Sequence, residues 1–131
     1  MTETIEPRRS GGCLCGQVRY TAPAQPLATA VCYCRDCQKQ AGSALSILAV
    51  FPRDAVQFDG AISCYHGQGT SGNVVLRNFC GQCGSPIYSD SDVMAERGGI
   101  AIFLTRWLFS ALGPYVNLAA GASRQPWGGR C

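Results

Sequence analysis

The sequence predicts a mostly β domain with little helix, stabilised by metal-bound cysteines. Short apolar segments recur along the chain, and 16 glycines provide for many tight turns between them. Nine cysteines occur in 131 residues, and most lie in closely spaced groups that are typical of metal ligation. The length favours a single domain, because domains most often have about 100–150 residues. We expect residues 1–10 to form a flexible tail and residues 11–131 to form one zinc-binding domain.

The first half of this domain contains three predicted strands and one helical turn. Polar and apolar residues alternate over Gln17–Ala22, which is the pattern of a half-buried strand. Ala28–Tyr33 is short and apolar and predicts a second strand, whereas the polar segment Arg35–Gln40 predicts a single helical turn. The aliphatic segment Ser43–Phe51 ends before Pro52 and predicts a central strand, because proline cannot continue the hydrogen-bond ladder of a sheet interior.

The second half contains the remaining predicted elements. In chain order these are a turn at Pro52–Asp54, strands at Ala61–His66, Asn73–Phe79, Pro86–Ser89 and Ile100–Leu104, a short helix at Trp107–Leu112 and a last strand at Tyr115–Ala119. The glycine-rich stretch Gly67–Gly72 separates the first two of these strands. Most of the predicted elements are therefore strands joined by turns.

Composition and charge exclude several classes of protein. Hydrophobic residues make up 47% of the chain, so a disordered chain is not expected. No apolar run approaches the ~20 residues of a membrane helix, and the polar segment Met1–Gly12 does not resemble an export signal, so we expect a cytoplasmic protein. The formal charge is +3, and it falls to zero when two zinc ions and seven thiolates are counted. Neither nucleic acid nor a membrane is therefore expected as a partner.

Four cysteines have the spacing of a closed structural zinc site. Cys80 and Cys83 form a CxxC turn, and the following Gly84 permits a backbone conformation that a Cβ atom would penalise. Structural zinc commonly binds four sulfurs from two such short pairs, and Cys13 with Cys15 is the natural second pair. The alternatives are a disulfide or a redox pair at Cys80 and Cys83, and iron in place of zinc.

Three further cysteines predict a different kind of metal site. Cys32, Cys34 and Cys37 provide three thiolates within six residues. Three protein ligands leave one position of a tetrahedral zinc open, which is the arrangement of catalytic zinc, and thiolate surroundings suit exchange of another thiol. The alternative is a second closed site, for which the sequence offers Cys64, His66 or Cys131 as the fourth ligand.

The residues around the open site have less specific interpretations. His66 is the only histidine, and its turn-like surroundings predict a surface loop. Arg35 and Lys39 are either solvated charges or groups that offset the negative charge of a fourth thiolate or hold a substrate carboxylate. Cys64 is expected to be buried on a strand as a small hydrophobic residue, and Cys131 to be a free terminal thiol.

Four stretches carry a resemblance to a known family. They are Gly11–Tyr20 (GGCLCGQVRY), Cys32–Ala44 (CYCRDCQKQAGSA), Asn78–Ser89 (NFCGQCGSPIYS) and Ala122–Trp127 (ASRQPW). In this order they resemble the glutathione-dependent formaldehyde-activating enzyme family, which also contains centromere protein V. The resemblance implies a small tent-like antiparallel β fold built around two zinc-thiolate sites. It assigns Cys13, Cys15, Cys80 and Cys83 to structural zinc, and Cys32, Cys34 and Cys37 to catalytic zinc.

The resemblance also implies an activity, that of a zinc-dependent carbon–sulfur lyase similar to S-(hydroxymethyl)glutathione synthase. Such an enzyme reversibly joins a thiol, such as glutathione, to formaldehyde or another small aldehyde. The alternatives are a non-catalytic, zinc-stabilised binding module and a thiol-based sensor, since a fold does not determine a function.

The chain departs from the family pattern at one position and in two regions. Tyr33 replaces a frequent histidine beside the three-cysteine group. Phe103–Pro114 is apolar where relatives commonly carry an acidic residue, and Asn117–Trp127 lacks an aromatic residue that is often found there. These differences leave the identity of the thiol open. Within this region, Trp107–Phe109 is expected to be core, with a homodimer contact as the alternative.

Overall fold

Two antiparallel sheets form the described part of the protein, which in this computed structural model comprises residues 8–23 and 25–103. The strands are β1 (Arg8–Gly12), β2 (Arg19–Pro23), β3 (Ala28–Cys32), β4 (Ser46–Pro52), β5 (Gln57–Asp59), β6 (Ile62–Gln68), β7 (Val74–Cys80), β8 (Pro86–Ser91) and β9 (Gly99–Phe103). The helices are α1 (Arg35–Ala41), the 3₁₀ turn η1 (Arg53–Ala55) and α2 (Asp92–Glu96). The prediction of a mostly β, antiparallel fold is confirmed.

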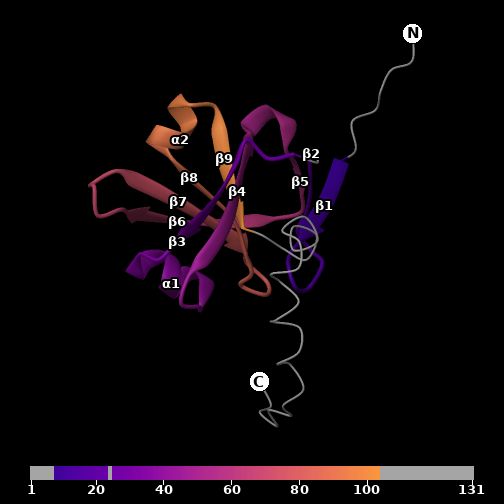
Figure 1. Cartoon of the computed structure of the whole chain (residues 1–131). Helices are drawn as coiled ribbons and strands as arrows, with labels where there is room; N and C mark the ends of the chain where they lie inside the picture. The colour runs from indigo at the N-terminus through magenta and orange to yellow at the C-terminus, as the bar shows by residue number, and fades with distance from the viewer. Residues whose placement is uncertain (1–7, 24, 104–131) are drawn as a thin grey trace, which may run out of the picture.

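The larger sheet has the strand order β3-β4-β9-β8-β7-β6, and the smaller has the order β1-β2-β5. Figure 1 shows the smaller sheet on the right of the larger one. Strand β4 lies between β3 and β9, in agreement with the central position predicted for the aliphatic segment. Strand β9 is buried along its whole length, as expected for the most apolar strand.

Three elements were not predicted, and one boundary was wrong. β5, α2 and β1 have no strong apolar pattern because they are short and partly exposed. β1 begins at Arg8, so residues 8–10 lie in a strand and not in the expected tail. Arg8–Ser10 pair with β2, and the Arg8 guanidinium donates a hydrogen bond to the Ala55 carbonyl at 2.8 Å. An edge strand can be polar because only part of it is covered.

The elements predicted beyond residue 103, the helix Trp107–Leu112 and the strand Tyr115–Ala119, lie outside the described residues. The homodimer contact predicted for Trp107–Phe109 lies there too. Within residues 8–23 and 25–103, we find no helix that is long and apolar enough to cross a membrane.

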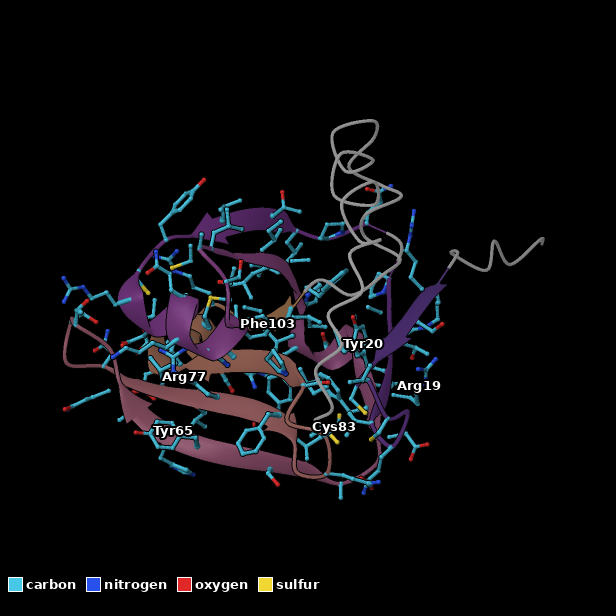
Figure 2. All side chains as sticks on the ribbon, turned by 90° about the horizontal axis from the view of Figure 1, so that it is seen from below. Arg19, Tyr20, Tyr65, Arg77, Cys83 and Phe103 are labelled. Carbon is cyan, nitrogen blue, oxygen red and sulfur yellow. The ribbon has the colours of Figure 1, made fainter. Side chains whose placement is uncertain are left out.

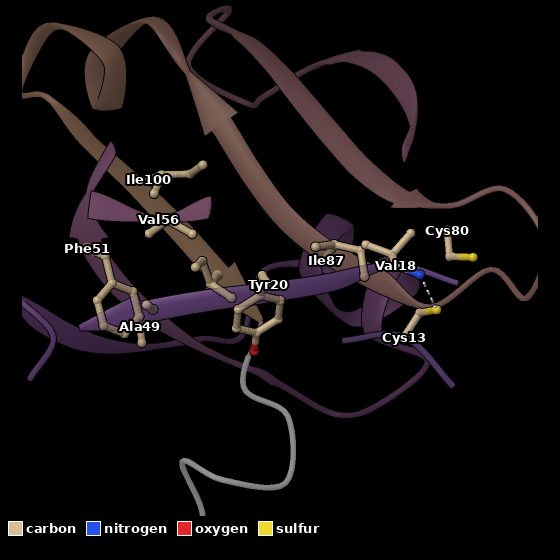
Figure 3. Packing of buried hydrophobic residues seen from close by; sticks show 11 residues of the cluster. Cys13, Val18, Tyr20, Ala49, Phe51, Val56, Cys80, Ile87 and Ile100 are labelled. Carbon is tan, nitrogen blue, oxygen red and sulfur yellow. Dashed lines mark hydrogen bonds between the residues drawn. The ribbon is translucent and has the colours of Figure 1, made fainter. Parts of the chain in front are cut away.

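The hydrophobic core is built from both sheets, and one cysteine cluster lies at its end. Tyr20 of β2, Phe51 of β4 and Ile87 of β8 are among its fully buried side chains. Cys13 and Cys80 belong to the same buried cluster of residues. Figure 3 shows these two cysteines at one end of the cluster and Phe51 at the other. A metal held by these cysteines would therefore be continuous with the core.

Candidate metal centres

The first cluster joins two loops that are far apart in the sequence. Cys13 and Cys15 follow β1, Cys80 ends β7, and Cys83 lies in the turn before β8. The four sulfurs lie within 4.8 Å of one another. The Cys13 and Cys15 sulfurs are 3.5 Å apart, and the Cys15 and Cys80 sulfurs are 3.7 Å apart. Sulfurs bound to one tetrahedral zinc lie about 3.8 Å apart, so the donor set fits this metal.

Two similar turns point the sulfurs at this common centre. The Gly16 N–H donates to the Cys13 carbonyl at 3.3 Å, and the Gly84 N–H donates to the Cys80 carbonyl at 2.8 Å. Both glycines have positive φ, 83° and 77°, a region in which a side chain would be strained. Cys80 and Cys83 are free thiols in this structure. The disulfide between them, which the sequence offered as an alternative to metal binding, is not formed.

Backbone and hydroxyl groups complete the surroundings of the first cluster. The Val18 N–H donates to the Cys13 sulfur at 3.2 Å, a bond drawn in Figure 3. The Ser85 hydroxyl lies 3.2 Å from the Cys83 sulfur and accepts a hydrogen bond from the Leu14 N–H at 3.0 Å. Ser85 therefore links the two turns. Its only signal in the sequence is a small polar residue directly after the CxxCG motif, which did not predict this role.

The thiols of this cluster differ sharply in pKa. Hydrogen bonds from the Ser85 side chain and backbone lower the pKa of Cys83 to about 5. The backbone N–H of Gln17 favours the Cys15 thiolate, but desolvation and the neighbouring cysteines outweigh it and raise the pKa of Cys15 to about 12. Closely spaced thiolates repel one another, so a divalent cation is needed for all four to ionise together.

The second cluster is local, and the start of α1 builds it. Cys32 ends β3, Cys34 is the N-cap of α1, and Cys37 lies in the first turn of this helix. Their three sulfurs lie within 4.8 Å of one another. Cys34 has extended backbone angles, and its sulfur accepts a hydrogen bond from the Cys37 N–H at 3.3 Å. This bond is the largest cause of the lowered pKa of the Cys34 thiol.

Neither of the described residues suggested as a fourth ligand joins the second cluster. Cys64 and His66 lie on β6 and are not among the grouped donors, and Cys131 lies outside the described residues. The predicted burial of Cys64 was wrong, because β6 is an edge strand and leaves this thiol exposed. His66 is exposed as predicted, although it lies on a strand rather than in a loop.

A cavity of about 340 Å³ opens beside the second cluster. Cys34 and Cys37 line it together with Arg35 of α1 and Arg77 of β7. A neighbouring cavity of about 520 Å³ shares Arg77 and Asp36 with it and is also lined by Lys39. Pockets for small molecules commonly have about 300–1,000 Å³, so a small thiol would fit next to the cysteines.

Arg77 is a charged residue of these cavities that was not predicted from the sequence. Its side chain is 15% exposed, and its guanidinium lies 3.7 Å from the Asp36 carboxylate. It also donates a hydrogen bond to the Gln40 side chain. Figure 2 shows Arg77 beside α1, whereas Cys83 lies nearer the three-stranded sheet. Only the sheet register brings this residue of β7 to the helix, so no sequence pattern marked it.

One of two comparisons with known proteins gives a match that covers both cysteine clusters. A search of curated proteins found no significant match. A scan of protein families matched residues 8–111, which include both cysteine clusters and the cavity beside the second one. That match confirms the resemblance that the sequence motifs indicated. The chain belongs to the glutathione-dependent formaldehyde-activating enzyme family.

Proposed function

We propose that this protein is a zinc-dependent carbon–sulfur lyase that reversibly joins a thiol, such as glutathione, to formaldehyde or another small aldehyde. The observation that carries the proposal is the second cluster. Three thiols lie together, two of them (Cys34 and Cys37) line a cavity, and no fourth donor joins them within the described residues. Family membership supports the same reaction class.

The first cluster is proposed to hold a structural zinc through Cys13, Cys15, Cys80 and Cys83. The sulfur spacing and the position at the end of the core support this role. Such a metal would connect segments 65 residues apart, as measured from Cys15 to Cys80. Closing so long a loop removes conformational freedom from the unfolded chain and so stabilises the fold.

The second cluster is proposed to hold the catalytic zinc through Cys32, Cys34 and Cys37. A metal held by these three cysteines would supply the Lewis acidity that lowers the pKa of a substrate thiol, so that its thiolate would be available at neutral pH. The chain offsets the additional negative charge with the first N–H groups of α1 and with Arg35 at the cavity wall. The cavity lined by Cys34 and Cys37 offers room for a small aldehyde next to this sulfur.

The overall reaction involves no oxidant or reductant. The thiol sulfur forms a bond to the aldehyde carbon, the carbonyl π bond breaks, and the oxygen becomes a hydroxyl group. The proton lost by the thiol balances the proton gained by the oxygen. The residues that line the cavity near Cys34 include no histidine, and we assign the proton transfer to solvent.

A thiol-based sensor is the second candidate, because Cys34 is exposed and its pKa is lowered. An exposed thiol of low pKa is susceptible to oxidation. Mild oxidation would then release the second metal and form a disulfide among the three cysteines. The non-catalytic binding module differs from both in retaining its metals without accelerating the reaction.

Exchange NMR on a glutathione–formaldehyde mixture tests the proposal, with the spontaneous rate subtracted at matched pH. The zinc-loaded protein should accelerate exchange between the free and hydroxymethylated thiol, and Cys34→Ser should remove the acceleration. Cys64→Ser is the matched control, since it removes an exposed cysteine outside both clusters. No acceleration by a protein that carries two zinc ions would contradict the proposed reaction.

A further inference from the structure

A buried serine lies directly behind the second cluster. Ser46 is the first residue of β4 and pairs with Cys32 of β3 in the antiparallel register. Directly opposed residues on neighbouring strands point to the same face of a sheet, so the Ser46 hydroxyl and the Cys32 thiol share a face. Only 3% of Ser46 is exposed, and α1, which carries Cys37, packs against β4.

The Ser46 hydroxyl makes no hydrogen bond that meets ordinary geometric limits within the described residues. Buried hydroxyl groups nearly always have a partner, so an unpaired one requires an explanation. The Cys37 sulfur is the one in the cluster that the Ser46 side chain faces. Cys37 lies on the helix that packs against β4, so its sulfur is the acceptor available to this hydroxyl.

We propose that Ser46 is a positioning residue of the three-cysteine metal site, and that its hydroxyl donates a hydrogen bond to the Cys37 sulfur when the cluster binds zinc. Metal-bound cysteine is a thiolate and therefore a stronger acceptor than the neutral thiol. The bond satisfies the buried hydroxyl and fixes the orientation of the Cys37 side chain. It also complements Cys34, whose sulfur already accepts from a backbone N–H.

The inference rests on the proposed occupation of the second cluster, and metal binding by the full-length protein tests it without an assay of activity. Cobalt(II) replaces zinc, and a chromophoric chelator competes for the second metal. Ser46→Ala should bind the second cobalt about tenfold more weakly, the lower end of what outer-shell partners contribute. It should also shift the sulfur-to-cobalt charge-transfer band, because the thiolate loses a donor.

Ser46→Thr, which keeps the hydroxyl, should restore both the affinity and the band position. Ser43→Ala is the matched control, because this nearby serine is exposed and should leave both readouts unchanged. Retention of the first cobalt by every variant shows that the fold is intact. Equal affinity and an unshifted band in Ser46→Ala would overturn the role of Ser46 alone. A wild-type protein that binds only one metal would overturn this role and the proposed function together.

Discussion

The two cysteine clusters use the same ligand type in opposite structural settings. The four-cysteine cluster joins the loop after β1 to the turn between β7 and β8, and Cys13 and Cys80 are 7% and 0% exposed. The three-cysteine cluster comes from six consecutive positions, and Cys34 is exposed at the helix start. A metal at the first cluster would fix distant segments, whereas a metal at the second would constrain only a local turn.

The groups around the sulfurs differ in the same way. Ser85 links the two turns of the first cluster, and the chain itself supplies all four sulfurs, two of them buried and only that of Cys15 exposed. The second cluster borders a cavity, and cationic side chains share the wall with the cysteines. This difference teaches that ligand type alone does not separate a structural from a reactive thiolate site. What separates them is how much of the ligand sphere the chain encloses.

The largest expected effect is the loss of folding in Cys80→Ser. This cysteine is fully buried in the core cluster and faces the other sulfurs, so its removal affects both metal binding and packing. We expect the free energy of unfolding to fall by about 4 kcal/mol or more, as in other losses of a metal site. Chemical denaturation with metal analysis measures this. Native stability with two bound zinc ions would contradict the structural role.

Cys34→Ser should remove the second metal site and leave the first site and the fold intact. Serine is a favoured N-cap residue, so its hydroxyl can accept the hydrogen bond that the Cys34 sulfur accepts from the Cys37 N–H. The free energy of unfolding should therefore change by less than about 1 kcal/mol. The second metal and the accelerated exchange should both be lost, as metal analysis and exchange NMR would show. Unfolding of this variant would instead indicate two structural sites.

Arg35→Ala should weaken binding of the thiol substrate without removing either metal. Arg35 lines the cavity beside the cysteines, and its loss leaves more uncompensated negative charge when a fourth thiolate binds. We expect about threefold to tenfold weaker binding, which is typical for a partly exposed charge. Lys39→Ala is the comparison, since Lys39 lines only the neighbouring cavity and should have a smaller effect. Unchanged thiol affinity in Arg35→Ala would show that Arg35 does not contribute to binding the thiol.

The smallest effect is expected at an ion pair whose residues belong to neither cluster. Arg53 binds the Asp90 carboxylate through two hydrogen bonds of 2.7 and 2.6 Å, which lower the pKa of Asp90 below its ordinary value of 3.8. The stabilisation is therefore present above about pH 4 and is lost as the pH falls through the lowered pKa. Asp90→Asn should cost about 1 kcal/mol at pH 7, a modest value because Arg53 is partly exposed.

Denaturation of the wild type and Asp90→Asn across pH measures this contribution. The difference between them should shrink below pH 4, and both proteins should bind two metals at pH 7. A constant difference down to pH 2 would show that the carboxylate charge is not the cause. Loss of metal in Asp90→Asn would show that the ion pair supports a cluster, which would weaken the separation drawn between the two sites.

Local patterns predicted the strands and the cysteine groups, because both features depend on residues that lie close together in the sequence. Cys80 and Cys83 form a recognisable turn, and alternation or aliphatic runs marked β2 and β4. The sequence did not reveal Arg77 or Ser46, because only the register of the sheet brings them to the cysteines. Cys64 was misjudged for the same reason, since its exposure depends on β6 being an edge strand.

Cadmium-113 NMR of the cadmium-loaded protein tests the central claim most directly, because the resonance position of cadmium reports the number of bound sulfurs. We predict two resonances, one for each cluster. Added glutathione should move only the resonance of the three-cysteine cluster, towards the position of four-sulfur coordination, and Cys34→Ser should lack that resonance. The account would be contradicted if glutathione shifted neither resonance. It would also be contradicted if glutathione shifted the resonance of the four-cysteine cluster.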